Sequence, residues 1–143
     1  MSQELYQAEI VARAKAGQQD SRLEPHDARA TVDNPLCGDR VTVDLALDGE
    51  QVRALGHRTR GCALCQAAAE TLRRCAPGRD RTLAEQGRKA VAEFLAGGAP
   101  LAEPWRGFEV FEPVRAYPSR HSCVLLPLDA FVAAATGRDP DGR

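Results

Sequence analysis

The stretch DNPLCGDRVTVDLALDG (residues 33–49) decides how this chain of 143 residues folds. Its second half alternates apolar and polar residues over positions 40–47, the period of a half-buried β-strand. Asp48-Gly49 follows, a pair that favours a tight hairpin turn. Residues 51–57 then return as the partner strand. The stretch therefore predicts a β-hairpin.

The first half of the stretch places a thiol and a carboxylate two residues apart, at Cys37 and Asp39. Pro35 fixes its own backbone and pushes Asn34 towards an extended shape, while Gly38 permits angles that a side chain would forbid. We expect a tight, non-helical loop that displays the thiol and the carboxylate together. Such a pair suits a borderline metal ion or a controlled, reactive thiol. A surface turn with an ordinary cysteine is the alternative.

The hairpin returns the chain to the edge of the sheet at which it began, because its strands are antiparallel. Gly61-Cys62 is therefore expected close to the Cys37 loop. The alanine-rich residues 63–72 favour a helix, which puts Cys62 at the helix N-terminus, where backbone N–H groups and the helix dipole stabilise a thiolate. Cys65 follows three residues later, on the same face.

Helices are also expected at residues 3–16 and 82–95, with a weak strand at 28–32 and a loop-rich or short-helix segment at 99–115. Thr82 is the expected N-cap of the second of these helices, with Glu85 in the capping-box position. The first helix has an apolar side made of Leu5, Ala8, Val11 and Ala12.

A final helix is expected over residues 124–136. Pro127 is tolerated in the first turn of a helix, so this helix should begin near Leu125 or Leu126, with Cys123 at its mouth. The chain is interpreted as a single domain over residues 1–143, with a frayed tail at 137–143.

Composition excludes several classes of protein. The chain is 43% hydrophobic and 27% charged, with a net charge of −1, which is typical of a globular protein and gives no case for nucleic-acid binding. It has no long apolar run and no signal-peptide pattern, so we expect no membrane association and a cytoplasmic location. In a reducing compartment its five cysteines should be thiols, which indicates metal binding or thiol chemistry.

Cysteine spacing alone leaves two interpretations open. Cys62 and Cys65 have the C-x2-C spacing of metal ligands, but no second such pair and no His-x3-His pair completes a zinc finger. A shared metal site and scattered thiols both stay open on this observation.

Three segments together resemble the NifU/IscU-type iron–sulfur cluster assembly family. They are Asn34-Pro35-Leu36-Cys37-Gly38-Asp39 before a hairpin, Gly61-Cys62-Ala63-Leu64 opening an alanine-rich helix, and Arg120-x2-Cys123-x-Leu125-Leu126. The resemblance extends from about residue 5 to about residue 136. The long interval between the last two cysteines, and the arginine before the last one, are similar to the SufU-like branch. Ser122 stands where the IscU branch has a histidine, which the SufU-like branch lacks. The basic lead-in at 57–60 departs from the family pattern, as do Cys65 and Ala67 to Ala69, where the family usually carries serines.

The resemblance implies an α+β fold, a three-stranded antiparallel sheet with helices packed on one face. It implies that Cys37, Asp39, Cys62 and Cys123 converge on a site for a zinc ion or a [2Fe-2S]-type cluster. It also implies that a cysteine desulfurase supplies persulfide sulfur, and that recipient apo iron–sulfur proteins or a carrier take the product.

Residue roles follow from the same resemblance. Cys123 would accept the persulfide and Cys62 would be the thiol beside the metal. Independently of the resemblance, Arg120 lies close to Cys123 in the sequence and is expected to support its thiolate by lowering its pKa. Cys65 is a further metal ligand, a second persulfide acceptor or a small buried helix residue.

Two mechanisms stay open within this family, so the sequence does not decide whether the protein is an enzyme. One is a scaffold that builds a cluster, and the other is a zinc-dependent sulfur acceptor that relays persulfide without holding a cluster. Outside the family, the alternatives are a structural zinc module and a cysteine hydrolase. The hydrolase would use Cys62 or Cys123 as nucleophile and His57 or His121 as base.

Overall fold

The computed structural model describes residues 3–137. Strands β1 (Ala28–Asp33), β2 (Arg40–Asp48) and β3 (Gln51–Arg60) form one antiparallel sheet in the order β1-β2-β3. The predicted hairpin is confirmed. β3 runs past its expected end at residue 57, and Arg60 pairs with Arg40 at the far end of the ladder. This extension brings the start of the next helix to the loop between β1 and β2.

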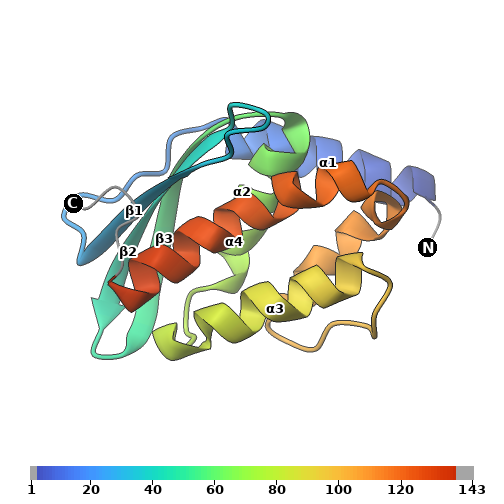
Figure 1. The fold of residues 1–143 in the computed structure, drawn as a ribbon. Helices are drawn as coiled ribbons and strands as arrows, with labels where there is room; N and C mark the ends of the chain where they lie inside the picture. Colours follow the sequence, from blue (N-terminus) through green and yellow to red (C-terminus); the bar gives the residue numbers. More distant parts are fainter. Residues whose placement is uncertain (1–2, 138–143) are drawn as a thin grey trace.

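The helices lie on one face of the sheet (Figure 1). Helix α4 (His121–Thr136) packs against β1 and β2, and helix α2 (Ala63–Cys75) packs against β3. Helix α1 (Gln3–Gly17) packs against α2, and helix α3 (Ala84–Leu95) packs against α4. The α+β architecture expected from the sequence is therefore confirmed.

The hydrophobic core lies between the sheet and the pair α2 and α4. It continues under η2 (Trp105–Ala116), a 3-10 helix in the segment that was expected to be loop-rich or short-helical. Alternating residues of β2 point into the core, as the sequence pattern predicts. The largest fully buried apolar side chains include Val41, Val43, Leu45, Leu72, Phe108, Phe111, Leu128 and Phe131.

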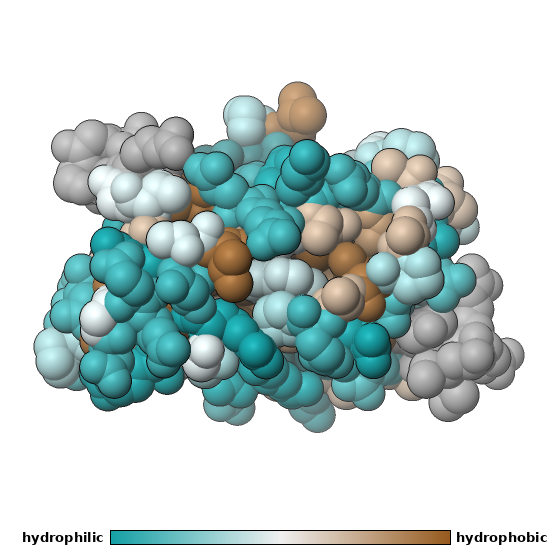
Figure 2. All heavy atoms as spheres, turned by 90° about the horizontal axis from the view of Figure 1, so that it is seen from below, coloured by the Kyte–Doolittle hydropathy of each residue, from teal (hydrophilic) through white to brown (hydrophobic). Residues whose placement is uncertain are grey.

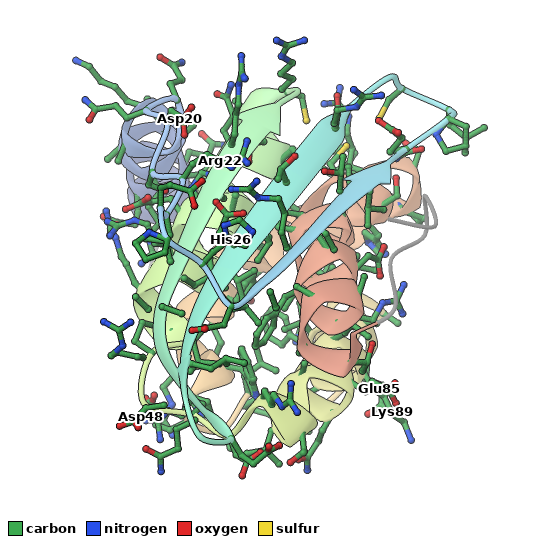
Figure 3. All side chains as sticks on the ribbon, turned by 90° about the vertical axis from the view of Figure 1, so that its left-hand side faces the viewer. Asp20, Arg22, His26, Asp48, Glu85 and Lys89 are labelled. Atoms are coloured by element: carbon green, nitrogen blue, oxygen red, sulfur yellow. The ribbon has the colours of Figure 1, made fainter. Side chains whose placement is uncertain are left out.

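The other face of the sheet is crossed by the connector between α1 and β1, which we define as residues 18–27. Figure 3 shows Asp20, Arg22 and His26 of this connector in front of the strands. The fully buried carboxylate of Asp44 accepts hydrogen bonds from Arg22 Nε and the Leu23 backbone N–H, both at 2.9 Å, and from Arg29 Nε at 2.5 Å. The connector is thus fixed to the sheet by one acidic side chain.

Two local predictions are wrong. In α1, Val11 is 66% exposed, while Ile10, Ala14 and Gly17 are buried, because α1 lies so close to α2 that a Cβ on Gly17 would be 2.2 Å from the Gln66 carbonyl oxygen. The close contact between α1 and α2 is therefore made through Gly17, and not through the apolar side of α1 that the sequence predicts.

The other wrong prediction concerns the cap before α3. Asp80, and not Thr82, caps the 3-10 turn that precedes α3 (η1, Arg81–Leu83), and its carboxylate accepts from the Thr82 N–H at 2.9 Å. Aspartate is a strong capping residue, and its position two residues before a backbone donor gives the required geometry.

Figure 2 shows the side of the molecule that faces down in Figure 1. Hydrophilic residues dominate this side, and hydrophobic residues form only small, separate patches. In residues 3–137, no helix is long and apolar enough to cross a membrane. Gly137 ends α4 with a left-handed backbone (φ 71°), and the rest of the tail expected at 137–143 lies outside the described residues.

Candidate metal centre

The Cys37 loop is built by Asn34. The Asn34 side-chain oxygen accepts from the Leu36 N–H at 3.0 Å, and its backbone carbonyl accepts from the Gly38 N–H at 2.8 Å. Gly38 has a left-handed backbone (φ 75°), which a side chain would strain. The result is the tight, non-helical turn that the sequence predicts, with Cys37 exposed at its tip.

Asn34 also ties this loop to the start of α4. Its Nδ2 donates to Ser122 Oγ at 3.1 Å, so the residue just before Cys123 is held against the turn that carries Cys37. Sequence reasoning assigned Asn34 only a backbone role. Its Asn-Pro dipeptide could have indicated a side-chain-to-backbone turn, but the bond to Ser122 depends on contacts between distant segments.

Cys123 lies inside a helix and not at its mouth, contrary to the prediction. α4 begins at His121, so Cys123 is its third residue, and Pro127 lies in the second turn. Pro127 cannot donate the hydrogen bond that the Cys123 carbonyl would normally receive. The burial of nine residues of α4 offsets this loss, so the helix passes through the proline without ending.

Cys62 is the N-cap of α2, as predicted, and its carbonyl accepts from the Gln66 N–H at 3.1 Å. Its thiol interacts with the thiol of Cys123 and contributes to raising the pKa of that thiol. One ligand atom from each of Cys37, Asp39 and Cys123 lies within 4.8 Å of the others. Figure 3 shows sulfur atoms gathered beside the loop between β1 and β2. Cys37, Asp39 and Cys123 therefore lie close enough to share a metal ion, while Cys62 lies outside this group and stays a predicted ligand.

Asp39 is 6% exposed, and its Oδ2 is buried without a hydrogen-bond partner among the described residues. Gly61 covers this carboxylate closely, because a Cβ at position 61 would lie 2.7 Å from Asp39 Cγ and 3.0 Å from Oδ2. A buried carboxylate oxygen without a partner is energetically unfavourable unless it binds a cation. The arrangement fits a metal ligand.

Acidic groups are crowded around Cys123. Burial raises the pKa of the Cys123 thiol to about 12, and Cys62, Cys37 and Asp39 add to the rise. Arg120 is not among the largest causes of this shift, so its support of the Cys123 thiolate stays a prediction. A cation in the middle of the group would reverse the effect, since it favours the charged form of each donor.

Arg120 is exposed and lies on the wall of a groove of about 460 Å³. The groove is otherwise mostly apolar, and Leu64 of α2 and Tyr117 are among the residues that line it. Arg120 lies three residues before Cys123 in the sequence, and its role in sulfur transfer stays a prediction.

Cys65 is fully buried one turn into α2. Burial raises the pKa of its thiol, and the neighbouring Asp39, Cys62, Cys123 and Cys37 raise it further. Cys65 is outside the group whose ligand atoms lie within 4.8 Å of one another, so its role as a fourth thiolate ligand stays a prediction.

The histidines do not serve these cysteines as bases in the structure. His57 is buried on β3, with Nδ1 3.0 Å from Thr59 Oγ1 and Nε2 3.8 Å from a Glu70 carboxylate oxygen. His121 Nε2 lies 3.1 Å from the Val114 carbonyl oxygen. Within residues 3–137, neither imidazole has a recorded hydrogen bond to a site thiol, which removes the support for a cysteine hydrolase.

Comparison with known families shows which family the chain belongs to. The family model for the NifU-like N terminal domain matches residues 5–123. The chain belongs to the NifU-like N-terminal domain family. The match covers the Cys37 loop, the hairpin, α2 and the start of α4, up to Cys123. The NifU-like resemblance inferred from three short segments is thus confirmed over most of the chain.

Two solved structures share this NifU-like fold. One is a nitrogen-fixing NifU-like protein (N-terminal) from Brucella abortus, with 31% identity, 94% of each chain covered and a TM-score of 0.83. The other, from Fervidobacterium islandicum AW-1, is described as a candidate iron–sulfur cluster assembly scaffold for the SUF system. It has 25% identity, 94% of this chain and 99% of that chain covered, and a TM-score of 0.81.

A curated relative is the zinc-dependent sulfurtransferase SufU of Bacillus subtilis (strain 168). It is 26% identical over 100 residues, which make up 66% of this chain. The match spans 65% of the length of that relative.

Proposed function

We propose that this NifU-like protein accepts persulfide sulfur from a cysteine desulfurase and assembles or passes on an iron–sulfur cluster at Cys37, Asp39, Cys62 and Cys123. The observation that carries the proposal is the Asp39 Oδ2 atom, which is buried without a partner in the described structure beside converging thiols. A structural role would give this oxygen a donor, whereas a metal or cluster site needs it free.

The donor set suits a cargo that must be released. Thiolates bind zinc and iron strongly, while a carboxylate oxygen is the weakest partner for a soft metal in such a set. Asp39 is therefore the bond expected to break first when the cargo leaves. A bound zinc ion would hold the thiols as thiolates and keep them from oxidation.

Cys37 and Cys123 differ in exposure, and we assign them different roles in sulfur transfer. Cys37 is exposed on the turn and is the thiol most open to a partner. Cys123 is 7% exposed under this turn, and the bond between Asn34 and Ser122 keeps the two thiols together. We assign the persulfide to Cys123, which a movement of the turn would uncover for the donor.

A second candidate is a zinc-dependent sulfur acceptor that relays persulfide and never holds a cluster. The relative from Bacillus subtilis, which carries that activity in its name, favours this candidate. A purely structural zinc module is less well supported, because Cys37 is exposed and structural zinc sites are usually closed by paired motifs.

Metal and sulfide analysis of protein purified without air tests the site. Iron with acid-labile sulfide is the expected result for a scaffold, and zinc without sulfide for a relay. Cys37→Ser and Cys62→Ser should each lower the metal content severalfold, since each removes a ligand. Cys75→Ser is the matched control, because Cys75 lies at the other end of α2 from Cys62. Unchanged metal content in both site variants would disprove the shared site.

Desulfurase assays test the sulfur-transfer part. The wild-type protein should increase the rate at which a cysteine desulfurase turns over cysteine, and Cys123→Ser should lose this increase while it keeps its fold. Activation of an apo iron–sulfur protein by the loaded wild-type protein would then separate the scaffold from the relay. An equal rate increase with Cys123→Ser would contradict the assignment of the persulfide.

A further inference from the structure

We propose that Cys65 and Cys62 form a dithiol that reduces the delivered persulfide sulfur to sulfide inside this protein. The inference rests on the proposed function, since it needs a persulfide at the site. It gives a chemical role to the buried thiol of Cys65. Such a step would supply sulfide, the oxidation state that an iron–sulfur cluster contains, without a separate reductant for the first turnover.

The two cysteines have the geometry of a redox pair. Cys62 is the N-cap of α2 and Cys65 is its third residue. Cα atoms three residues apart on an α-helix are about 5 Å apart, inside the range of about 4.4–6.8 Å that a disulfide needs. A C-x2-C pair at the start of a helix is also the arrangement in which one thiol is reactive and the other resolves.

The surroundings of Cys65 restrict what it can react with. Its side chain has no exposed surface, so thiols and oxidants in solution do not reach it directly. The ionisable groups that interact with its thiol are Asp39, Cys62, Cys123 and Cys37, which are the groups of the proposed metal centre. Sulfur that arrives at the centre is therefore the partner available to Cys65.

The reaction balances with these groups alone. The outer sulfur of a Cys123 persulfide first passes to Cys62, whose thiol interacts with that of Cys123, and the Cys62 proton moves to Cys123. Cys65 sulfur then attacks the inner sulfur of the Cys62 persulfide. The bond between Cys62 and Cys65 forms, the bond to the outer sulfur breaks, and the Cys65 proton leaves with it as hydrogen sulfide. Two thiols are oxidised to a disulfide, and the outer sulfur is reduced by the same two electrons.

The disulfide also removes Cys62 from the set of metal ligands. Sulfide production and weakened metal binding would therefore occur together, and a dithiol reductant would be needed to restore the site for a second turnover.

The test uses metal-free, fully reduced wild-type protein and glutathione persulfide under exclusion of air. Trypsin should release residues 61–73, a peptide that holds Cys62 and Cys65 and no other cysteine. We expect this peptide to become two hydrogens lighter and to resist thiol alkylation, with about one sulfide released per chain. A wild-type peptide that stays fully alkylated after sulfur loading would overturn the inference without any variant.

Two variants complete the test. Cys65→Ser and Cys65→Ala should keep the sulfur as a protein persulfide and release at least about tenfold less sulfide, while Cys75→Ser should behave as wild type. Equal sulfide release after equal loading would overturn this inference and leave the proposed function standing. If sulfur attached to neither wild type nor variants, the acceptor function would fail, and this inference with it.

Discussion

Two buried aspartates near the start of β2, Asp39 and Asp44, have opposite environments. Asp44, in the middle of β2, is fully buried and accepts hydrogen bonds from two arginines and a backbone N–H. Asp39, just before β2, is 6% exposed and has a buried oxygen without a partner in the described structure. The completely satisfied carboxylate and the one that is left open are five positions apart in the sequence.

The difference separates a structural role from a binding role. Burial alone would raise the pKa of Asp44, but hydrogen bonds from Arg29, Arg22 and the Leu23 N–H outweigh it, so this pKa lies below its usual range. Such a group stabilises the fold in its charged form. Asp39 lies beside thiols instead, and its Oδ2 has no hydrogen-bond partner among residues 3–137, so we expect a bound cation to be its favourable partner.

The largest expected effect is on stability. Asp44→Asn should lower the free energy of unfolding at neutral pH by about 2–3 kcal/mol, because it leaves the donors of the connector without a charged acceptor. Asp39→Asn in metal-free protein should stay within about 1 kcal/mol of wild type or be more stable, since a neutral side chain is easier to bury. Urea unfolding measures both, with the transition slope as a check.

Metal content should rank the two variants in the opposite order. Asp39→Asn should lower the metal retained per folded chain, and Asp44→Asn should not. If the two variants lost equal stability without metal, Asp39 would be a structural residue and the comparison would fail.

A smaller effect is expected for Gly61→Ala. The added Cβ would press against the Asp39 carboxylate, and we expect a loss of about 1–2 kcal/mol in stability together with weaker metal binding. Gly49→Ala is the control. Position 49 has open space but a left-handed backbone (φ 61°), so this variant should lose about 1 kcal/mol and keep its metal. Normal metal binding by Gly61→Ala would contradict the close approach of Gly61 to the ligand.

The smallest effect is a pH dependence. The pKa of Asp44 is lower in the folded protein than the unfolded value of about 3.9, so its stabilisation is complete above that value and is lost as the pH falls through the folded pKa. The stability difference between wild type and Asp44→Asn should therefore shrink below about pH 4. Urea unfolding at several pH values between 7 and 3 measures it, and a constant difference would rule out the ionised carboxylate as its source.

Much of the fold could be predicted because local patterns and tertiary packing agree. The alternation in β2, the Asp48-Gly49 turn and the alanines of α2 each favour the structure that is observed. The predictions failed where packing overrides local preference. Pro127 does not limit the start of α4, and the buried side of α1 is chosen by close contact through Gly17, which no periodicity of apolar residues reveals.

The candidate ligands of the site could be predicted from the sequence, but the contacts that hold these ligands in place could not. Cys37, Asp39 and Cys62 follow from a loop and a hairpin, which are local features, and Cys123 entered through a family resemblance. The bond between Asn34 and Ser122 joins residues that are 88 positions apart, and the contact of Gly61 with Asp39 depends on the exact register of β3. Neither contact leaves a local signal in the sequence.

The position of α4 has a consequence for how the protein is made. α4 covers β1 and β2 and also carries Cys123, so the same helix closes the core and completes the group of thiols. A ribosome produces this helix after the sheet and after α1, α2 and α3, and long-range contacts form late. A growing chain that still lacks α4 also lacks Cys123 and should hold cargo less tightly. Full occupancy of the site would thus report that α4 has packed onto the sheet.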